Sequence, residues 1–386
     1  MSLAQELVAA LRAVLPGPKP VPLHEPCFAG NEWKYLKDCL DTGWVSSVGS
    51  YVDRFEADLA RFTGARRAVA VVNGTAALQV ALRLAGVQAG DEVIVPSLTF
   101  VATANAVAYL GATPHFADSA EETLGLDPAA LARHLAQVAA ARQGQCLNRQ
   151  TGQVIRAVVP MHVFGHPVDL DGLQKVCEEF GLVLVEDAAE SLGSYYHGRH
   201  TGTFGRLATL SFNGNKTITT GGGGAILTND EELGRLAKHL TTTAKPPHPW
   251  AYAHDQLGYN YRLPNLNAAL GCAQLEQLPA FLGRKRRLAE AYAKALAGLE
   301  GARVFREPPD CQSNYWLNAL ILDRGREAEL TPCLEATNQA GIMTRPAWEL
   351  MHRLPMYQAC PRMALPVAES LAGRILNLPS GPRLLA

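Results

Sequence analysis

Short apolar segments of strand character alternate with segments of helical character over residues 68–186. The predicted strands are Ala68–Val72, Glu92–Pro96, Thr113–Ala117, Val154–Pro160 and Leu182–Glu186, and the predicted helices are Thr75–Leu84, Thr103–Tyr109, Pro128–Val138 and Leu170–Phe180. This alternation predicts an α/β fold whose largely parallel sheet is covered by helices on both faces. Right-handed crossovers then place every strand-to-helix turn along one edge of the sheet, where ligands bind.

The chain has 386 residues, and single cores tend to divide beyond about 250–300 residues. We therefore expect more than one lobe. The predicted parts are an N-terminal helical arm over residues 1–20, a large domain over 21–265, and connecting helices with a small C-terminal domain over 266–386. The connecting helices are predicted as two segments, Leu266–Leu278 and Ala280–Leu299.

Composition excludes several classes of function. A net charge of −1 provides no basic field for nucleic acid. The eight cysteines include no C-x-x-C pair, which indicates thiols in a reducing compartment and neither a disulfide frame nor a metal site. The amphipathic N-terminus lacks the features of a signal peptide, and no apolar run approaches the roughly 20 residues that cross a bilayer. We expect a cytoplasmic protein without a membrane partner.

One lysine follows a strand of the predicted sheet. Leu207–Phe212 and Ala225–Leu227 are short apolar runs separated by a polar turn and four glycines, which predicts two neighbouring strands. Lys216 lies in that turn, where loss of solvent favours the neutral amine. Such an amine can form a Schiff base with the aldehyde of pyridoxal phosphate. The alternative is an ordinary solvated lysine in a turn. The assignment of Lys216 therefore depends on whether the chain also supplies the other parts of a cofactor site.

Two more strand ends carry polar residues. At Gly74 and Thr75 a strand turns into a helix, and the N–H groups of a helix start favour an anion such as phosphate. An ordinary helix cap explains the same residues, and neither a dinucleotide fingerprint nor a Walker loop is present. Asp187 could pair with a protonated pyridine nitrogen, although helix capping, magnesium or ribose binding are alternatives.

Phe100 and Ser211 complete the set of candidates. Phe100 follows another strand and could stack on a flat ring, although core packing is common for phenylalanine. Ser211 lies on the strand before Lys216 and could donate to a phosphate or simply to backbone. Together these residues, all at strand ends of one sheet edge, predict a phosphate cradle, a ring stacker, a ring-nitrogen partner and a Schiff-base lysine.

The chain resembles the DegT/DnrJ/EryC1/StrS sugar aminotransferases, which have the fold of aspartate aminotransferase (fold type I). The motifs that carry the resemblance are Asn73–Leu78, Phe100–Asn105, Glu186–Glu190, Ser211–Lys216, Gly258–Arg262 and Asn377–Ser380. Residues 45–55, 161–170, 213–230, 239–245 and 344–357 are similar to one branch of the family. That branch makes 4-amino sugars of the bacillosamine and legionaminic-acid type from nucleotide-linked 4-keto hexoses.

The resemblance implies roles for individual residues. Lys216 would bind pyridoxal 5'-phosphate covalently, while Asp187 would face the pyridine nitrogen and Glu190 the ring hydroxyl. The other cofactor contacts would be Phe100 on the ring and Gly74, Thr75, Ser211 and Asn260 on the phosphate. Asn260 would reach across a dimer interface, which implies a homodimer with shared active sites. Asn213 and Glu190 stand where many relatives have histidine and glutamine.

The implied reaction moves an amino group from L-glutamate, which leaves as 2-oxoglutarate, to a nucleotide-linked 4-keto-6-deoxy sugar. Lys216 would act as nucleophile and general base. Candidate contacts to the sugar nucleotide are Trp44, Tyr315, Arg345 and His352. Two rival hypotheses are a cysteine desulfurase or lyase of the same fold, which needs a reactive cysteine on a mobile loop, and a non-catalytic sugar-nucleotide-binding homologue.

Overall fold

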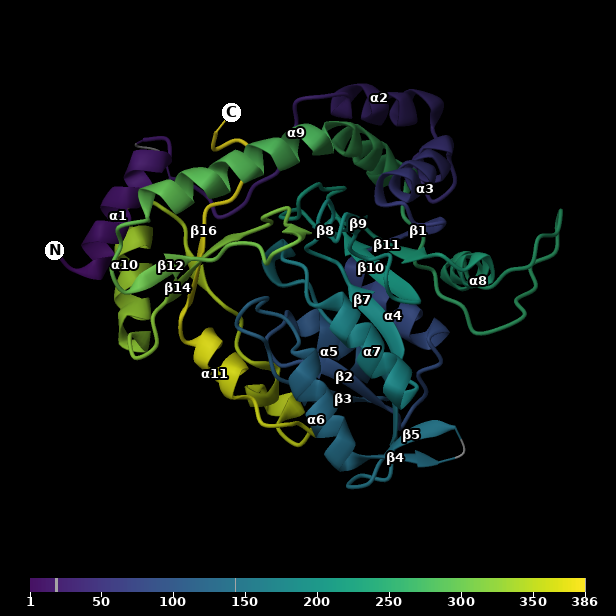
Figure 1. Cartoon of the computed structure of the whole chain (residues 1–386). Helices are drawn as coiled ribbons and strands as arrows, with labels where there is room; N and C mark the ends of the chain where they lie inside the picture. The colour runs from purple at the N-terminus through teal and green to yellow at the C-terminus, as the bar shows by residue number, and fades with distance from the viewer. Residues whose placement is uncertain (18–19, 143, 386) are drawn as a thin grey trace.

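A nine-stranded sheet forms the largest layer of the protein (Figure 1). The computed structural model describes residues 1–17, 20–142 and 144–385. The main path has the order β1-β11-β10-β7-β6-β2-β3, and the hairpin of β4 and β5 joins it through β6. The strands are β1 (Arg67–Val71), β2 (Glu92–Pro96), β3 (Thr113–Ala117), β4 (Ala139–Arg142), β5 (Gln145–Asn148), β6 (Val154–Val158), β7 (Val183–Asp187), β10 (Leu207–Ser211) and β11 (Gly224–Thr228).

All strands of the main path run in one direction except β11, which is antiparallel to both of its neighbours, β1 and β10. The predicted largely parallel sheet is therefore confirmed. β11 is reversed because the turn that carries Lys216 leads straight back from β10 without a crossover helix. Consequently β1, β2, β7 and β10 end at the same edge of the sheet, and this edge receives the residues that follow them.

Helices cover both faces of the sheet, as alternating strand side chains show. Val69 and Val71 of β1 belong to one core cluster, with α4, α5 and α8, whereas Ala68 and Ala70 belong to another, with α3 and α9. The helices α6 and α7 pack over the same sheet around Ile94. These helices are α3 (Ser50–Thr63), α4 (Gly74–Leu84), α5 (Val101–Ala108), α6 (Pro128–Val138), α7 (Leu170–Phe180) and α8 (Glu231–Thr241).

Polar side chains fix where the helices begin after the strands. Asn73 accepts a hydrogen bond from the backbone N–H of Ala76 at 2.7 Å, and Asp127, Asp169 and Asp230 cap α6, α7 and α8 in the same way. Each cap satisfies an N–H that the helix itself leaves unpaired. The strand-to-helix turns are thus set by local sequence, which is why they could be located in advance.

A second, four-stranded sheet has the order β12-β14-β16-β15. Its apolar face packs against α1, α9 and α10, so that the N-terminal helix lies against the C-terminal part of the chain. A small third sheet of β13, β8 and β9 is hydrogen-bonded to neither of these sheets, but Tyr196 and Cys311 pack into a core cluster of the nine-stranded sheet. The elements are α1 (Leu3–Val14), α10 (Leu330–Gln339), α11 (Pro366–Ala372), β8 (Tyr195–Tyr196), β9 (Arg199–His200), β12 (Ala302–Val304), β13 (Cys311–Gln312), β14 (Asn318–Leu322), β15 (Arg345–Pro346), β16 (Ile375–Leu378) and the 3-10 turns η1 (Val163–Gly165), η2 (Glu327–Glu329), η3 (Met351–Arg353) and η4 (Pro355–Tyr357).

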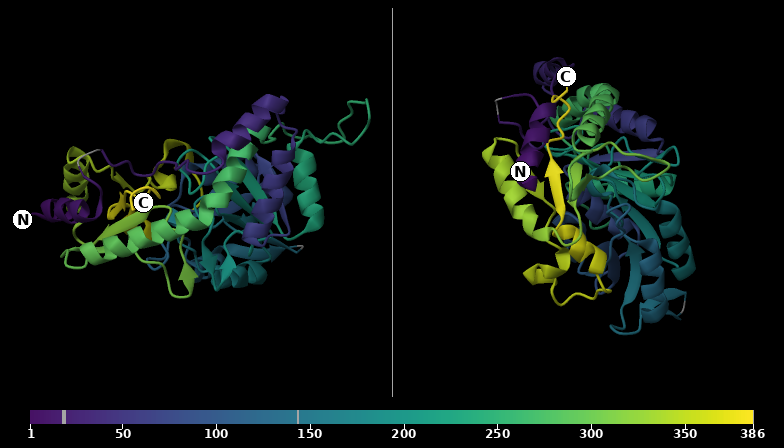
Figure 2. Two further views of the ribbon diagram at one scale, coloured as in Figure 1. Left: turned by 90° about the horizontal axis from the view of Figure 1, so that it is seen from above. Right: turned by 60° about the vertical axis from the view of Figure 1, so that its left-hand side comes forward.

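The helix α9 (Asn265–Ala295) is one continuous element of 31 residues, with Pro279 inside it. The prediction of two helices separated at Pro279 is wrong. A proline removes one helical N–H, but Leu278 and Phe281 on either side are buried in one core cluster, and this packing keeps the axis continuous. Figures 1 and 2 show α9 running from α1 and α10 at one end to α2 (Glu32–Thr42) and α3 at the other.

The chain between α8 and α9 extends away from the body of the molecule (Figures 1 and 2). It exposes Trp250, Tyr252 and Leu257 almost fully to solvent. None of the helices in the described ranges combines the length and the apolar character that crossing a bilayer requires. The division of the chain at residues 20 and 265 into three parts stays a prediction.

Candidate active site

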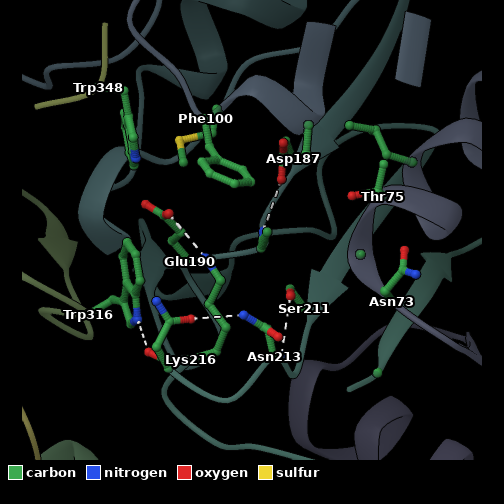
Figure 3. A pocket seen from close by; sticks show the side chains of 17 residues that line it. Asn73, Thr75, Phe100, Asp187, Glu190, Ser211, Asn213, Lys216, Trp316 and Trp348 are labelled. Atoms are coloured by element: carbon green, nitrogen blue, oxygen red, sulfur yellow. Dashed lines mark hydrogen bonds and ion pairs between the residues drawn. The ribbon is translucent and has the colours of Figure 1, made fainter. Parts of the chain in front are cut away.

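A cavity of about 310 Å³ lies where the ends of β1, β2, β7 and β10 meet (Figure 3). That volume is at the lower end of the range for small-molecule sites. Seven of the predicted site residues line it together, although they are spread over more than 140 positions of the chain. They are Gly74, Thr75, Phe100, Asp187, Glu190, Ser211 and Lys216.

One end of the cavity, which we call the cradle end, consists of Asn73, Gly74, Thr75 and Ser211 (Figure 3). Gly74 begins α4, and a Cβ atom at this position would lie 3.0 Å from the Cβ of Ser211. A side chain here would crowd Ser211, so glycine favours the close approach of the helix start to β10. The arrangement combines the N-terminus of an eleven-residue helix with two hydroxyl groups, and this suits an anion such as phosphate.

Asp187 ends β7 inside the cavity and is 5% exposed. Its Oδ2 accepts a hydrogen bond from the Thr103 hydroxyl at 2.8 Å, and its Oδ1 accepts one from the Ala189 N–H at 3.2 Å. Burial raises the pKa of the Asp187 carboxyl, whereas the Thr103 hydrogen bond and the charge of Lys216 oppose that rise. A cationic partner next to this buried carboxyl would stabilise its charged form.

Lys216 lies between a carboxylate and an aromatic ring. Its Nζ is 3.1 Å from Oε1 of Glu190 and 4.0 Å from the ring centroid of Trp316. The other oxygen of Glu190 accepts a hydrogen bond from the Phe164 N–H at 2.9 Å. Burial raises the pKa of Glu190 to about 7, in spite of the opposing charge of Lys216. A carboxyl group that titrates near neutral pH therefore lies within hydrogen-bonding distance of the Lys216 amine.

The opposite end, which we call the tryptophan end, is formed by Trp316 and Trp348 (Figure 3). The indole N–H of Trp316 donates to the Asn215 carbonyl at 2.7 Å, beside Lys216. Trp348 packs against Phe164 with ring centroids 5.0 Å apart and meets the edge of Phe100 at 6.4 Å. Both tryptophans come from segments that flank strands of the four-stranded sheet.

Sequence reasoning missed both tryptophans. The only local signal was their position beside predicted substrate contacts, since Trp316 follows Tyr315 and Trp348 lies four residues before His352. It also missed Thr103, whose hydroxyl holds Asp187 and whose position one turn into α5 resembles that of any buried helical threonine.

Five predicted site residues do not line this cavity. Trp44 is 57% exposed beside α2, Asn260 is exposed and accepts a hydrogen bond from Arg262, and Arg345 is exposed and donates to Asn338. Tyr315 is buried against His166, and the ring of His352 is hydrogen-bonded to the Ser97 hydroxyl at 2.7 Å. Their proposed contacts with substrate, or with the cofactor of a second subunit, stay predictions.

The residues of the cavity fit pyridoxal phosphate. The cradle end offers the start of α4 and the Ser211 hydroxyl. A Cβ atom added at Gly74 would fill the space between them. The buried Asp187 carboxylate provides the partner for a cationic ring nitrogen, Phe100 offers a half-exposed ring, and Lys216 offers a primary amine. The fold and this site together define an aminotransferase-type pyridoxal phosphate enzyme of fold type I.

Comparison with known proteins specifies the family. Residues 26–386 match the model of the DegT/DnrJ/EryC1/StrS aminotransferase family, and the chain belongs to that family. The expected fold, the aminotransferase class and pyridoxal phosphate as cofactor are thereby confirmed.

Relatives are similar over almost their whole length. The chain is 39% identical over 369 residues to GDP-perosamine synthase of Vibrio cholerae, covering 94% of this chain and 95% of that protein. It is 35% identical over 349 residues to dTDP-3-amino-3,4,6-trideoxy-alpha-D-glucose transaminase of Streptomyces venezuelae, covering 89% and 86%. The structure of DesI in the presence of its TDP-sugar product superposes with a TM-score of 0.81 at 31% identity, covering 96% and 91%. The chain is accordingly a sugar nucleotide aminotransferase.

Proposed function

We propose that this enzyme transfers the amino group of L-glutamate to the 4-keto group of a nucleotide-linked 6-deoxy hexose. The observation that carries the proposal is the shared cavity of Lys216, Asp187 and the cradle end. The relatives support a sugar nucleotide as acceptor, since their names refer to GDP-linked and dTDP-linked amino sugars. The 4-keto position rests on the resemblance of residues 213–230 and 344–357 to the branch that makes 4-amino sugars.

Bound pyridoxal phosphate supplies an electron sink that stabilises negative charge next to the transferred amino group. Asp187 would keep the ring nitrogen protonated, because a buried carboxylate attracts a cationic partner electrostatically. Thr103 and Ala189 hold that carboxylate in place through its two oxygens.

Lys216 performs the proton transfers. Its Nζ takes the α-proton of L-glutamate in the first half-reaction and moves a proton in the reverse sense when the keto sugar is the acceptor. When Lys216 is a free amine, Glu190 at 3.1 Å and the Trp316 ring at 4.0 Å hold it at the centre of the cavity. The Glu190 carboxyl, whose pKa burial raises to about 7, can take up or release a proton near neutral pH beside this amine.

We further propose a homodimer with shared active sites. Asn260 is exposed, and the nearby chain between α8 and α9 presents Trp250, Tyr252 and Leu257 to solvent. Exposed apolar side chains in one segment mark an interaction surface. A second copy that covers this segment would bring Asn260 to the cradle end of its neighbour, as the family resemblance implies.

A desulfurase is the less supported alternative. It needs an accessible, ionised cysteine. Cys311 and Cys333 are buried, and burial raises the pKa of each thiol to about 11. Cys360 is partly buried, and burial raises the pKa of its thiol as well.

A non-catalytic homologue would have no need of Lys216 and Asp187, which both face the cavity.

The test is to follow each half-reaction separately by absorption. The purified, cofactor-loaded enzyme should be yellow, lose this colour with L-glutamate and regain it with a 4-keto sugar nucleotide. A panel of UDP-, GDP- and dTDP-linked 4-keto-6-deoxy sugars, with a 3-keto sugar nucleotide as comparison, identifies the acceptor. Bleaching by L-glutamate without recovery by any 4-keto sugar would contradict the proposal.

A further inference from the structure

The two ends of the cavity differ in chemistry. The cradle end offers backbone N–H groups and hydroxyls from the start of α4 and from β10, whereas the tryptophan end offers two indole rings. Figure 3 shows Trp316 and Trp348 on the side of the cavity opposite Asn73 and Thr75, with Lys216 and Glu190 between. With the cofactor phosphate in the cradle end, the tryptophan end is the remaining part of the cavity beside Lys216 for a second molecule.

Trp348 is held in place without using its whole surface. Its ring packs on Phe164 at an interplanar angle of 34° and meets Phe100 edge-on at 62°. The residue is only partly buried and lines the cavity. Trp316, by contrast, is 5% exposed, and its indole N–H is already bonded to Asn215. Trp348 therefore has free aromatic surface for a ligand, while Trp316 completes the wall next to Lys216.

We propose that Trp348 binds the hexose ring of the keto sugar and so determines affinity for the acceptor substrate. This inference rests on the proposed function and adds the residue that recognises the sugar ring. A pyranose presents C–H groups on its faces, which pack on the negative face of an aromatic ring. L-Glutamate is a small molecule with two carboxylates, and an indole face gives it no comparable contact.

The assignment separates the two substrates. Loss of the Trp348 ring should weaken binding of the sugar and leave the affinity for the amino donor unchanged. L-Glutamate reacts at the same lysine but has no sugar ring that could stack on Trp348. It should also leave the affinity for a free nucleoside diphosphate unchanged, because the contact is with the sugar and not with the nucleotide. Trp348 is thus a specificity-determining residue and not a catalytic one.

The experiment compares Trp348→Ala and Trp348→Phe with wild type, using the cofactor-loaded full-length enzyme. The probe is the nucleotide-linked 4-keto-6-deoxy sugar that the wild type accepts best in the UDP, GDP and dTDP panel. We expect Trp348→Ala to raise the KM for this sugar at least about tenfold. The KM for L-glutamate and the inhibition constant of the matching free nucleoside diphosphate should stay within about twofold of wild type. A twofold change is well below the roughly tenfold change in a binding constant that the loss of one good contact causes.

Trp348→Phe and Trp33→Ala act as controls, and Trp348→Leu is held in reserve. Trp348→Phe keeps an aromatic face and should restore most of the affinity for the sugar, and Trp348→Leu replaces Trp348→Ala if the alanine variant does not fold. Trp33→Ala removes a tryptophan of α2 that is 85% exposed and outside the cavity, and it should leave the KM for the sugar unchanged. The absorption of the bound cofactor verifies that each variant is fully loaded.

An unchanged KM for the sugar in Trp348→Ala, or in Trp348→Leu, would overturn the inference while the proposed function stands. An equal rise in the KM for L-glutamate would also overturn it, since the ring would then serve both substrates. An equal rise in the inhibition constant of the nucleoside diphosphate would move the contact to the nucleotide and refute the sugar assignment. A wild type that reacts with L-glutamate and with none of the keto sugars would refute the proposed function itself.

Discussion

The cradle end and the tryptophan end of the cavity are built by different means. The cradle end belongs to the nine-stranded sheet and depends on backbone geometry, since a Cβ atom added at Gly74 would lie only 3.0 Å from the Cβ of Ser211. The tryptophan end comes from segments beside β14 and β15 of the four-stranded sheet and consists of large side chains. A site for an invariant cofactor can be made of backbone, whereas a site for a variable acceptor can be altered one side chain at a time.

Replacement of Lys216, which lies between the two ends, should have the largest effect on activity. Lys216→Ala removes the amine that serves both substrates, so both half-reactions should fall by on the order of 10⁴-fold, the upper range for general base catalysis. Borohydride reduction followed by mass measurement should attach the cofactor to wild type and not to the variant. Normal turnover by Lys216→Ala would refute the catalytic assignment.

A change at the cradle end should affect the cofactor and neither substrate. In Gly74→Ala the added methyl group would press on Ser211 and narrow the space for the phosphate. We expect cofactor affinity to fall by roughly ten- to a hundredfold, equivalent to about 1.4–2.8 kcal/mol. Equilibrium titration of the cofactor-free protein measures it, and at saturating cofactor the KM for each substrate should be nearly unchanged. A selective loss of sugar binding would show that the two ends are not separate.

The smallest expected effect concerns Glu190 and pH. The folded-state pKa of about 7 exceeds the ordinary value of 4.5, so the folded protein holds this proton more tightly than the unfolded chain. The stability that this proton contributes is therefore fully present below pH 4.5, and it is lost as the pH rises through about 7. Glu190→Gln does not titrate, so the melting temperature of the cofactor-free variant relative to wild type should increase from pH 5 to pH 8.

The melting-temperature comparison needs a matched control. Lys216 loses its carboxylate partner at every pH in the variant, so only the change of the difference with pH is diagnostic. Glu190→Asp, which keeps a titrating group, should retain a pH-dependent difference from Glu190→Gln. A difference in melting temperature that is constant between pH 5 and pH 8 would show that Glu190 is ionised throughout this range.

The contrast between the two ends also explains what could be predicted from the sequence. Gly74, Asp187, Ser211 and Lys216 follow strands, and parallel strands bring their ends to one edge, so local pattern was enough to unite them. Trp316 and Trp348 reach the cavity only through packing between the two sheets, a long-range arrangement that no spacing rule encodes. The family resemblance supplied the chemistry, but it directed attention to Tyr315 and His352 near those tryptophans.

The long helix α9 has a mechanical consequence for the enzyme. Its 31 residues correspond to about 46 Å of rigid rod, and this rod touches α2 and α3 near one end and α1 near the other. One element thus links the helices beside the nine-stranded sheet with those of the four-stranded sheet. The turn around Pro279 lacks one helical hydrogen bond, so the burial of Leu278 and Phe281 in one core cluster has to keep this rod straight.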